Sequence, residues 1–408
     1  ANFDMIAMAT SLLFEFVMAG PFAVDSFFFL SGLLLSFLWL KSFRKNPVGT
    51  NSFKGWIMFY VHRMLRLTPA YYISLLFYAF VFKQLMIGFP LNMNFLVFNI
   101  DDCPDTWYID LLYVHNWWEP NNLCMGVSWY LASETQIFLF TPLLLLPLAI
   151  KPVLGVIIAA VTILISTAAN IFMVYFYHWP TGMVYLSVPD PEMTNFENYN
   201  ELMYYNPLIR CQIYIIGMLV GWILQSRKTL KINSLFNLAA WGLVLALMLT
   251  VTLGLHEQSN GFEIPLFWRA MYSSLSRIAW GLSLSWIIVS CYYGYGGPIN
   301  SFMSWHIWIP LGRLTYCGYL MHMPIMVLVM AQITDEIYFS NFLEAFTRLI
   351  SIIFIVLFVS VFWSACFEIS FGKVQMIILG EDLRKRNQKT ISDKKTDEEQ
   401  ISNERTDL

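Results

Sequence analysis

Long apolar stretches recur along the whole chain, and they constrain its fold more than any other feature. Of the 408 residues, 58% are hydrophobic and only 12% are charged, against roughly 25% charged in soluble domains. Each stretch is near the roughly 20 residues that a helix needs to cross a bilayer, and a helix satisfies its own backbone hydrogen bonds in lipid. We predict about nine membrane-spanning helices, near residues 21–40, 68–88, 127–148, 153–176, 207–225, 235–255, 269–292, 309–331 and 343–366. The predicted fold class is an all-α, polytopic bundle in the membrane.

Lysine and arginine are distributed unequally between the loops, which predicts the orientation of the bundle. If nine spans alternate, the basic residues of the first, third and fifth connections and of the tail share one side: Lys41, Arg44, Lys45, Lys54, Arg63, Arg66, Lys151, Arg227, Lys228, Lys231, Lys373, Arg384, Lys385 and Arg386. The opposite connections are acidic, with Asp101, Asp102, Asp105, Asp110, Asp190, Glu192, Glu197 and Glu201. We therefore expect the basic side in the cytoplasm, with the first residues exterior or lumenal and the C-terminus cytoplasmic. Plasma membrane and endomembrane fit equally.

Three segments follow from this orientation. Residues 1–19 carry two acidic residues in a partly apolar stretch, and we expect an exterior, interfacial lead-in. Residues 20–370 form the membrane domain. Residues 371–408 form a cytoplasmic tail that is expected to be largely disordered, because from about Glu381 it offers almost nothing to bury. The net charge of −3 argues against nucleic-acid binding.

The cysteines agree with the same orientation. Cys103 and Cys124 share one exterior loop, and the oxidising side of a membrane favours a disulfide between them over two unrelated thiols. The other four are expected to be buried packing residues in or near the spans: Cys211, Cys291, Cys317 and Cys366. No cysteine and histidine spacing resembles a zinc site, and no metal is predicted.

Ionisable residues within the spans are candidates for function, because a partner or water must offset the free energy of inserting them. Asp25, Glu134, Arg277 and His322 lie inside spans, and Arg210, Arg313 and Arg348 lie near span ends. Arg277 belongs to a helical polar stripe that should face the bundle interior or a wet cavity: Arg269, Ser273, Ser276, Arg277, Trp280 and Ser283. A structural pair between helices, such as Arg277 with Glu134, is the alternative. For the set as a whole we favour a functional cavity.

Two arginines stand at the inner end of the second span. In "HRMLRLTPAYY", Arg63 and Arg66 are three residues apart on one helical face, just before Pro69, which we expect to open a helix. Two guanidinium forks on one face suit phosphate recognition. The positive-inside rule supplies arginine at such ends without any ligand, so spacing alone leaves both interpretations open.

Several segments in order carry a resemblance to a known family. "VDSFFFLSGLLLSFLWL", "RMLRLTPAYY", "LLYVHNWW…CMGVSWYLASETQIF", "YYNPLIRCQIYIIGMLVGWIL" and "WGLSLSWIIVSCYYGYGGPINSFMSWHIWIPLGRLTYCGYLMH" resemble the acyltransferase-3 family, and more narrowly its animal nose-resistant-to-fluoxetine-like branch. The resemblance covers residues 20 to 370. It implies a membrane O-acyltransferase that moves an acyl group, other than aminoacyl, from cytosolic acyl-CoA to an acceptor hydroxyl across the membrane. The acceptor would be a small molecule, sugar or lipid.

The resemblance also implies roles for matching residues. Arg63 and Arg66 would hold the phosphates of acyl-CoA as co-substrate, and the remaining positions match other family motifs. We interpret three residues as catalytic, His322, Asp25 and Glu134, and five as substrate-binding, Arg63, Arg66, Arg277, Arg313 and Ser31.

The sequence departs from the family pattern in two places. The family's first helix, with an "LxGLR" start and a histidine thought to be the catalytic base, has no match, and the late "E-x-P" reads "EIS" at Glu368. We expect either a truncation before Ala1 or a catalytically inactive relative, and we expect this chain alone to be inactive.

Acyl transfer to a hydroxyl requires a base, donors for the oxyanion and a held acyl donor. We hypothesise one cavity from an inner mouth at the two arginines to an outer acceptor site. Asp25 and Glu134 would lie in the outer half. His322 would lie between the inner arginines and these carboxylates and act as a proton shuttle. The alternative from a different class is a lipid or drug carrier, which moves its substrate without chemistry; no broken inverted repeat favours it.

Overall fold

The structure is a computed structural model that describes residues 12–85, 103–118, 123–181, 192–260, 262–332 and 342–378. In these ranges eight helices are long and apolar enough to cross a membrane. A ninth span is a helix pair, Gly126–Phe140 with Pro142–Ile150, bent by 41°. These segments coincide with the nine predicted spans and confirm the fold class. The acidic positions Asp101, Asp102 and Asp190 and the tail from residue 379 lie outside the described residues.

The spanning helices follow one another along the chain. They are α3 (Pro21–Lys45), α5 (Phe53–Leu76) continued by the π-helix η1 (Phe77–Phe82), α8 (Trp129–Phe140) with α9 (Pro142–Ile150), α10 (Pro152–Tyr177), α11 (Pro207–Ser226), α12 (Ser234–Leu253), α14 (Leu266–Tyr292), α16 (Trp308–Ala331), and α17 (Phe342–Trp363) continued by η5 (Ser364–Glu368) and α18 (Ile369–Ile378). The shorter helices are α2 (Leu12–Met18), α4 (Pro47–Thr50), α6 (Lys83–Leu85), α7 (Cys103–Leu111), η2 (Gly126–Ser128), η3 (Phe196–Asn198), η4 (Asn200–Tyr204), α13 (His256–Ser259) and α15 (Gly297–Met303).

The helix starts follow from local sequence. Proline stands in the first turn of α3, α9, α10 and α11, where its missing N–H would be unpaired in any case. Asn206 caps α11 by accepting a hydrogen bond from the Leu208 backbone, and Asn233 caps α12 in the same way.

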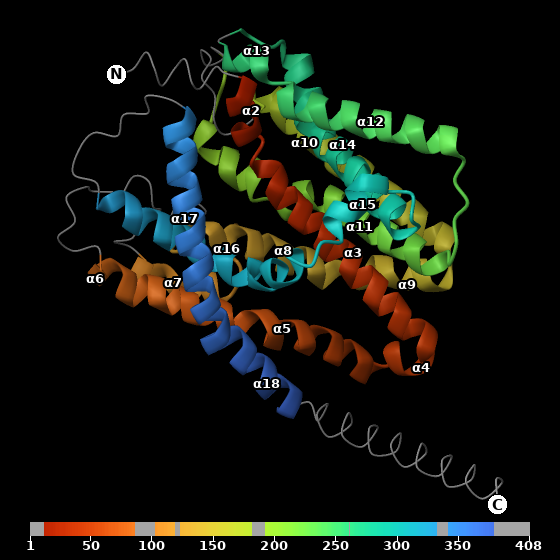
Figure 1. Ribbon diagram of the computed structural model, residues 1–408, viewed down its shortest axis with the longest axis horizontal. Coiled ribbons are helices and arrows are strands. Elements are labelled where there is room, and N and C mark those ends of the chain that lie inside the picture. The colour runs from red at the N-terminus through yellow and green to blue at the C-terminus, as the bar shows by residue number, and fades with distance from the viewer. Residues whose placement is uncertain are drawn as a thin grey trace, which may run out of the picture.

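Helix α11 is the centre of the bundle and packs most extensively on α3. The two backbones approach so closely that a Cβ at Gly32 or Gly217 would collide with the facing backbone carbonyl, as small residues allow at membrane helix crossings. Ser36 adds a hydrogen bond to the Met218 carbonyl across the same crossing at 2.8 Å. In Figure 1, α3 runs diagonally across the bundle, with α12 toward one side and α17 toward the other.

Contacts between helix ends gather the basic connections at one end of the bundle. Arg44, near the end of α3, donates to the Gln225 carbonyl and to Ser226 at the end of α11. Tyr293, just after α14, donates to the Arg227 carbonyl at 2.7 Å. We call this the basic end. The opposite end holds the starts of α3 and α11, together with α2, where Glu15 lies 3.4 Å from His256 of α13.

Two expectations about helix bounds differ from the structure. Pro69 does not open a helix: α5 begins at Phe53 and includes it. A membrane helix tolerates an internal proline when neighbouring groups satisfy the backbone near the break, and here Tyr316 of α16 donates to the Leu67 carbonyl at 2.7 Å. The last span is also longer than 343–366, because it continues to Ile378 as α18, which packs on α5.

The predicted disulfide and the predicted inward face of α14 are confirmed, whereas the predicted burial of the free cysteines is not confirmed throughout. Cys103 and Cys124 form the predicted disulfide. Of the free cysteines, Cys317 is buried but Cys366 is exposed, so the expectation of burial was wrong there. The α14 stripe faces the interior as predicted, since Ser273 bonds Asn170 of α10 at 3.0 Å and Trp280 bonds Ser26 of α3 at 2.9 Å.

Candidate functional site

A cavity of about 530 Å³ opens between α3, α5, α8, α16 and α18. It extends from the middle of these helices toward the basic end, since its lining includes Leu38 of α3, Phe59 of α5 and Gln375 of α18. Its polar lining residues are Ser31, His62, Arg63, Arg66, Glu134 and Gln375. Four of the residues predicted for the site from the sequence therefore share one cavity.

Glu134 is the centre of the first buried ionic cluster, which we call the cavity cluster (Ser31, Arg63 and Glu134). The Ser31 hydroxyl donates to Glu134 Oε1 at 2.6 Å, and Arg63 Nη2 donates to the same oxygen. Glu134 is buried, whereas 20% of the Arg63 side chain is exposed. The Arg63 guanidinium also lies over the Phe138 ring, 4.4 Å from its centroid, a favourable cation–π geometry. Arg63 is thus held in one orientation while part of its fork faces the cavity.

Arg66 lies one turn further along α5 on the same cavity wall and is exposed. The i, i+3 spacing places both guanidiniums on one face, as predicted. Because Glu134 neutralises one of the two arginines, these three residues give the wall a net charge of about +1. Such a wall attracts a phosphorylated ligand.

Glu134 does not lie where the sequence suggested. We expected it in the outer half, apart from the arginines, and gave Arg277 only as an example of a structural partner under the alternative interpretation. It instead pairs with Arg63. The third span starts with the short helix η2 and bends between α8 and α9, so Glu134 stands near the middle of the span.

Asp25 is the centre of a second cluster, which we call the enclosed cluster (Asp25, Arg210 and Arg277). Arg210 Nη1 donates to Asp25 Oδ1 at 2.7 Å, and Arg277 Nε lies 3.8 Å from Asp25 Oδ2. All three residues are at least nine-tenths buried. Asp25 is six residues before Ser31 on α3, roughly 9 Å along the axis at 1.5 Å per residue. The structure therefore brings Arg277 to Asp25, not to the cavity.

Arg210 is held rigidly in the enclosed cluster. Its Nε donates to the Tyr204 carbonyl at 2.9 Å, and its guanidinium lies against the rings of Tyr204 and Trp129 at 4.6 and 5.3 Å. Sequence reasoning noted Arg210 near a span end but assigned it no role. Its position four residues into α11, opposite Asp25, comes from the close α3–α11 crossing.

The late predicted residues lie elsewhere. His322 Nδ1 lies 2.6 Å from the Tyr319 carbonyl of its own helix, and it is not among the described residues that line the cavity. Arg313 is exposed near the start of α16. We expected one cavity with His322 between the inner arginines and the outer carboxylates. In the described residues Glu134 instead lies with Arg63, and Asp25 belongs to a separate ionic cluster.

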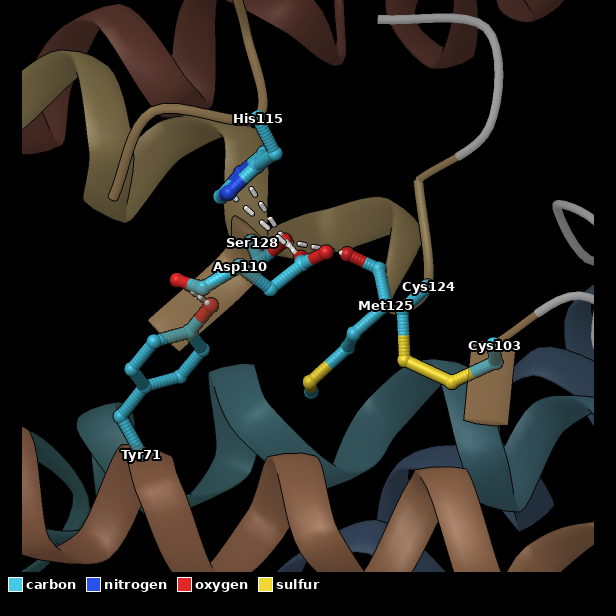
Figure 2. The surroundings of a disulfide bond; sticks show 7 residues. All are labelled: Tyr71, Cys103, Asp110, His115, Cys124, Met125 and Ser128. Carbon is cyan, nitrogen blue, oxygen red and sulfur yellow. Dashed lines mark hydrogen bonds and ion pairs between the residues drawn. A yellow bond between two sulfur atoms is a disulfide. The ribbon is translucent and has the colours of Figure 1, made fainter. Parts of the chain in front are cut away.

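A third polar cluster lies beside the disulfide and was missed by sequence reasoning (Figure 2). The Ser128 hydroxyl lies 2.7 Å from Asp110 Oδ1 and 3.1 Å from His115 Nε2, and His115 Nδ1 lies 3.5 Å from Asp110 Oδ1. Tyr71 of α5 donates to the Asp110 carbonyl at 3.1 Å. The only sequence signal was an acid and a histidine five residues apart in the cysteine-bridged loop.

Burial shifts the pKa values of both ionisable groups in this third cluster. It raises the pKa of Asp110, against hydrogen bonds from Ser128 and from the Cys124 and Met125 backbone, and it lowers the pKa of His115. Ser128 is fully buried, so its hydroxyl cannot meet a substrate as a nucleophile. The cluster instead fixes the disulfide-bridged loop to the start of α8, the helix that carries Glu134.

A second, apolar cavity of about 560 Å³ lies between α8, α9, α10 and α11. It sits at the bend of the third span, where Thr141 precedes Pro142, and its lining includes Ile137, Leu144 and Met218. Tyr214 of α11 also lines it. The cavity has the character of a site for hydrocarbon.

Within the described ranges, eight long apolar helices and one bent helix pair surround buried charges and a polar cavity, which defines a multi-pass integral membrane protein. Comparison with known proteins gives the particular family: the profile of the acyltransferase-3 family, described as an acyltransferase domain, matches residues 2–368. The chain belongs to the acyltransferase-3 family.

Two relatives from the nematode Caenorhabditis elegans are similar to the chain. Nose resistant to fluoxetine protein 6 is 26% identical over 383 residues, which cover 89% of this chain and 46% of that protein. Regulator of hypoxia-inducible factor 1 is 24% identical over 352 residues, which cover 83% of this chain and 64% of that protein. The chain thus spans about half the length of the first relative and under two-thirds of the second. No solved structure matches the chain.

Proposed function

We propose that the protein is a membrane-embedded O-acyltransferase that takes its acyl group from acyl-CoA and passes it to an acceptor hydroxyl. The observation that carries this proposal is the cavity wall that unites Arg63, Arg66 and Glu134. Family membership supports the reaction class. The donor and the acceptor are our inference.

The cavity residues have distinct roles in this proposal. Arg63, oriented by Glu134, and the exposed Arg66 would bind the phosphates of CoA, because guanidinium forks recognise phosphate oxygens in pairs. Ser31 and Arg63 both donate to Glu134 Oε1, so the Glu134 carboxyl is already engaged in holding the Arg63 side chain. Glu134 therefore acts as a positioning residue for Arg63 and not as the base.

The orientation follows from the basic end. The positive-inside rule places that end in the cytoplasm, where acyl-CoA is available, and puts the C-terminus on the cytoplasmic side. The acceptor, a small molecule, sugar or lipid, would then approach from the exterior or lumenal side of a plasma membrane or endomembrane. The base for the acceptor hydroxyl is not assigned to the cavity cluster, and His322 and Asp25 stay as predicted candidates.

The apolar cavity supports a second candidate, a carrier or inactive relative that binds membrane lipid without acyl transfer. Its apolar lining and its place at the bend of a span suit an acyl chain. Such a protein does not need to bind acyl-CoA at the arginines, so one binding measurement distinguishes the two candidates.

The test is equilibrium binding of radiolabelled palmitoyl-CoA to the purified chain in neutral detergent. The variant Arg63→Ala/Arg66→Ala should lose at least about tenfold in affinity, because each charge-assisted contact is worth roughly 1.5–3 kcal/mol. The matched control is Lys228→Ala/Lys231→Ala, which removes the same charge from two exposed residues of the α11–α12 connection. It should bind as the native protein does.

Two results would reject the proposal. One is absence of saturable binding by the native chain. The other is equal affinity of the native protein and the double arginine variant, with thermal unfolding showing that both are folded. Either result would favour the carrier.

A further inference from the structure

The enclosed cluster contains more positive than negative charge. Arg210 and Arg277 both contact Asp25, one guanidinium on each carboxylate oxygen. Arginine is always protonated in proteins, so two positive charges meet one negative charge. The cavity cluster, by contrast, pairs one arginine with one glutamate.

Both arginines also keep a guanidinium nitrogen without a hydrogen-bond partner. Arg210 Nη2 and Arg277 Nη1 are buried and unpaired among the residues that the structure describes. Arg210 is only 1% exposed and Arg277 only 9% exposed. Bulk water therefore does not satisfy Arg210, and it reaches Arg277 only marginally.

An uncompensated buried charge costs several kcal/mol, and an unpaired buried donor adds to that amount. Packing alone would not require the second arginine, because the Asp25–Arg210 pair is already neutral. One additional anion would offset the excess charge and accept from both free nitrogens.

We propose that the enclosed cluster is a binding site for one oxyanion, a carboxylate or a phosphate, held by Arg210 Nη2 and Arg277 Nη1. Two guanidinium donors match an anion with at least two acceptor oxygens. The site lies at the opposite end of α3 from the basic end and is separate from the acyl-CoA cavity. If the protein is the acyltransferase proposed above, the bound oxyanion would be an acidic group of the acceptor, and this assignment rests on the proposed function. The binding of an anion at the site does not depend on it.

The bound oxyanion could belong to a water-soluble anion or to the headgroup of an acidic lipid. The test therefore has two arms, both read as the midpoint of thermal unfolding. In neutral detergent, sodium phosphate or sodium acetate replaces sodium chloride at constant ionic strength. In nanodiscs, phosphatidylcholine alone is compared with phosphatidylcholine plus phosphatidylglycerol.

The native protein should unfold at a higher temperature with the oxyanion or with the acidic lipid, since a ligand that binds only the folded state stabilises it. Arg277→Gln should lose this response, with an apparent affinity at least about tenfold weaker. Arg227→Gln, an exposed residue after α11, is the charge-matched control and should respond as the native protein does.

Asp25→Asn should change the response in the opposite direction, and each variant is compared with its own unfolding midpoint in the absence of the oxyanion. It removes the competing carboxylate, so both arginines become available and the oxyanion should bind more tightly and raise the unfolding midpoint further. A purely structural ion pair predicts no such gain.

A higher unfolding midpoint with phosphate or acetate in detergent would identify the ligand as a soluble anion. A higher midpoint only with phosphatidylglycerol would identify it as a lipid headgroup. Both results support the site. No response in either arm, or equal responses of native and Arg277→Gln proteins, would overturn it. Loss of palmitoyl-CoA binding leaves this readout unaffected, so the two proposals fail separately.

Discussion

The cavity cluster and the enclosed cluster each contain one residue of α3, Ser31 and Asp25, yet their electrostatics differ. Glu134 has one arginine partner that is partly exposed to a cavity. Asp25 has two arginine partners in nearly complete burial. The difference teaches that burial alone does not define a role: the first cluster orients a charge toward a cavity, and the second concentrates excess charge in a closed space.

The largest expected effect is the difference in unfolding free energy between removing the fully buried Asp25 and removing Glu134 beside the cavity. Asp25→Ala should lower the free energy of unfolding by about 3–5 kcal/mol, because it leaves two buried arginines without a counter-charge. Glu134→Ala should lower it by only about 1–2 kcal/mol, since Arg63 can turn toward the cavity and its water. Detergent-denaturation curves of the two variants would check the order, and equal losses would contradict the contrast.

The disulfide should matter for the cavity cluster and not for the enclosed one. Cys103→Ser opens a link between residues 21 apart, and a loop of this size is worth about 3 kcal/mol. Because the loop anchors the start of α8, we expect weaker palmitoyl-CoA binding but an unchanged phosphate response. Cys366→Ser, at an exposed free cysteine, is the control; a parallel loss of both responses in Cys103→Ser would refute the separation.

The two arginines of the enclosed cluster should differ in their structural importance. Arg210→Gln removes the 2.7 Å bond to Asp25 and the bond to the Tyr204 carbonyl, which should cost about 2–3 kcal/mol. Arg277→Gln leaves the neutral Asp25–Arg210 pair and removes the excess buried charge, so without a bound anion it should not lower stability and should raise it. The same denaturation assay measures both, and a reversed order would show that Arg277 is the main structural partner of Asp25.

The smallest expected effect is a pH dependence at the third cluster. Burial lowers the pKa of His115, so between its lowered folded pKa and its ordinary value near 6.5 the unfolded state binds more protons. The contribution of His115 to stability is therefore present above about pH 6.5 and is lost on acidification. The raised pKa of Asp110 acts in the opposite direction, because protonation at falling pH favours its folded state.

His115→Gln should isolate these two opposing contributions. The variant should show a smaller loss of unfolding temperature from neutral to mildly acidic pH than the native protein. Hydrogen exchange of residues 103–118 at both pH values would localise the change. An unchanged pH profile would show that His115 does not titrate within this range.

The spans and the polar stripe were predictable because both are periodic in sequence. The α14 stripe faces inward through Ser273 and Trp280, as a helix of 3.6 residues per turn requires. The arginine pair of α5 was predictable for the same reason. The start of α5 was not, because proline favours the first turn of a helix, whereas α5 begins at Phe53 and contains Pro69 in its interior.

The sequence could not predict which of the buried charged residues pair with one another. The sequence identified Asp25, Glu134 and Arg277 as costly charges in lipid. It placed Glu134 in the outer half, apart from Arg63, whereas the structure pairs the two residues. The third cluster has no periodic signal at all, since its acid, histidine and serine come from a helix, a loop and a helix start joined by a disulfide.

The sequence by itself determined that the chain forms a membrane bundle, which residues are too polar to lie in lipid, and which family the motifs resemble. The reason is that hydrophobicity and helical spacing are properties of neighbouring residues. Only the tertiary structure decided that Asp25 meets Arg210 and Arg277 while Glu134 meets Arg63 and Ser31. Those pairings depend on the crossing of α3 with α11 and on the bend after α8, and both are set by packing between segments far apart in the chain.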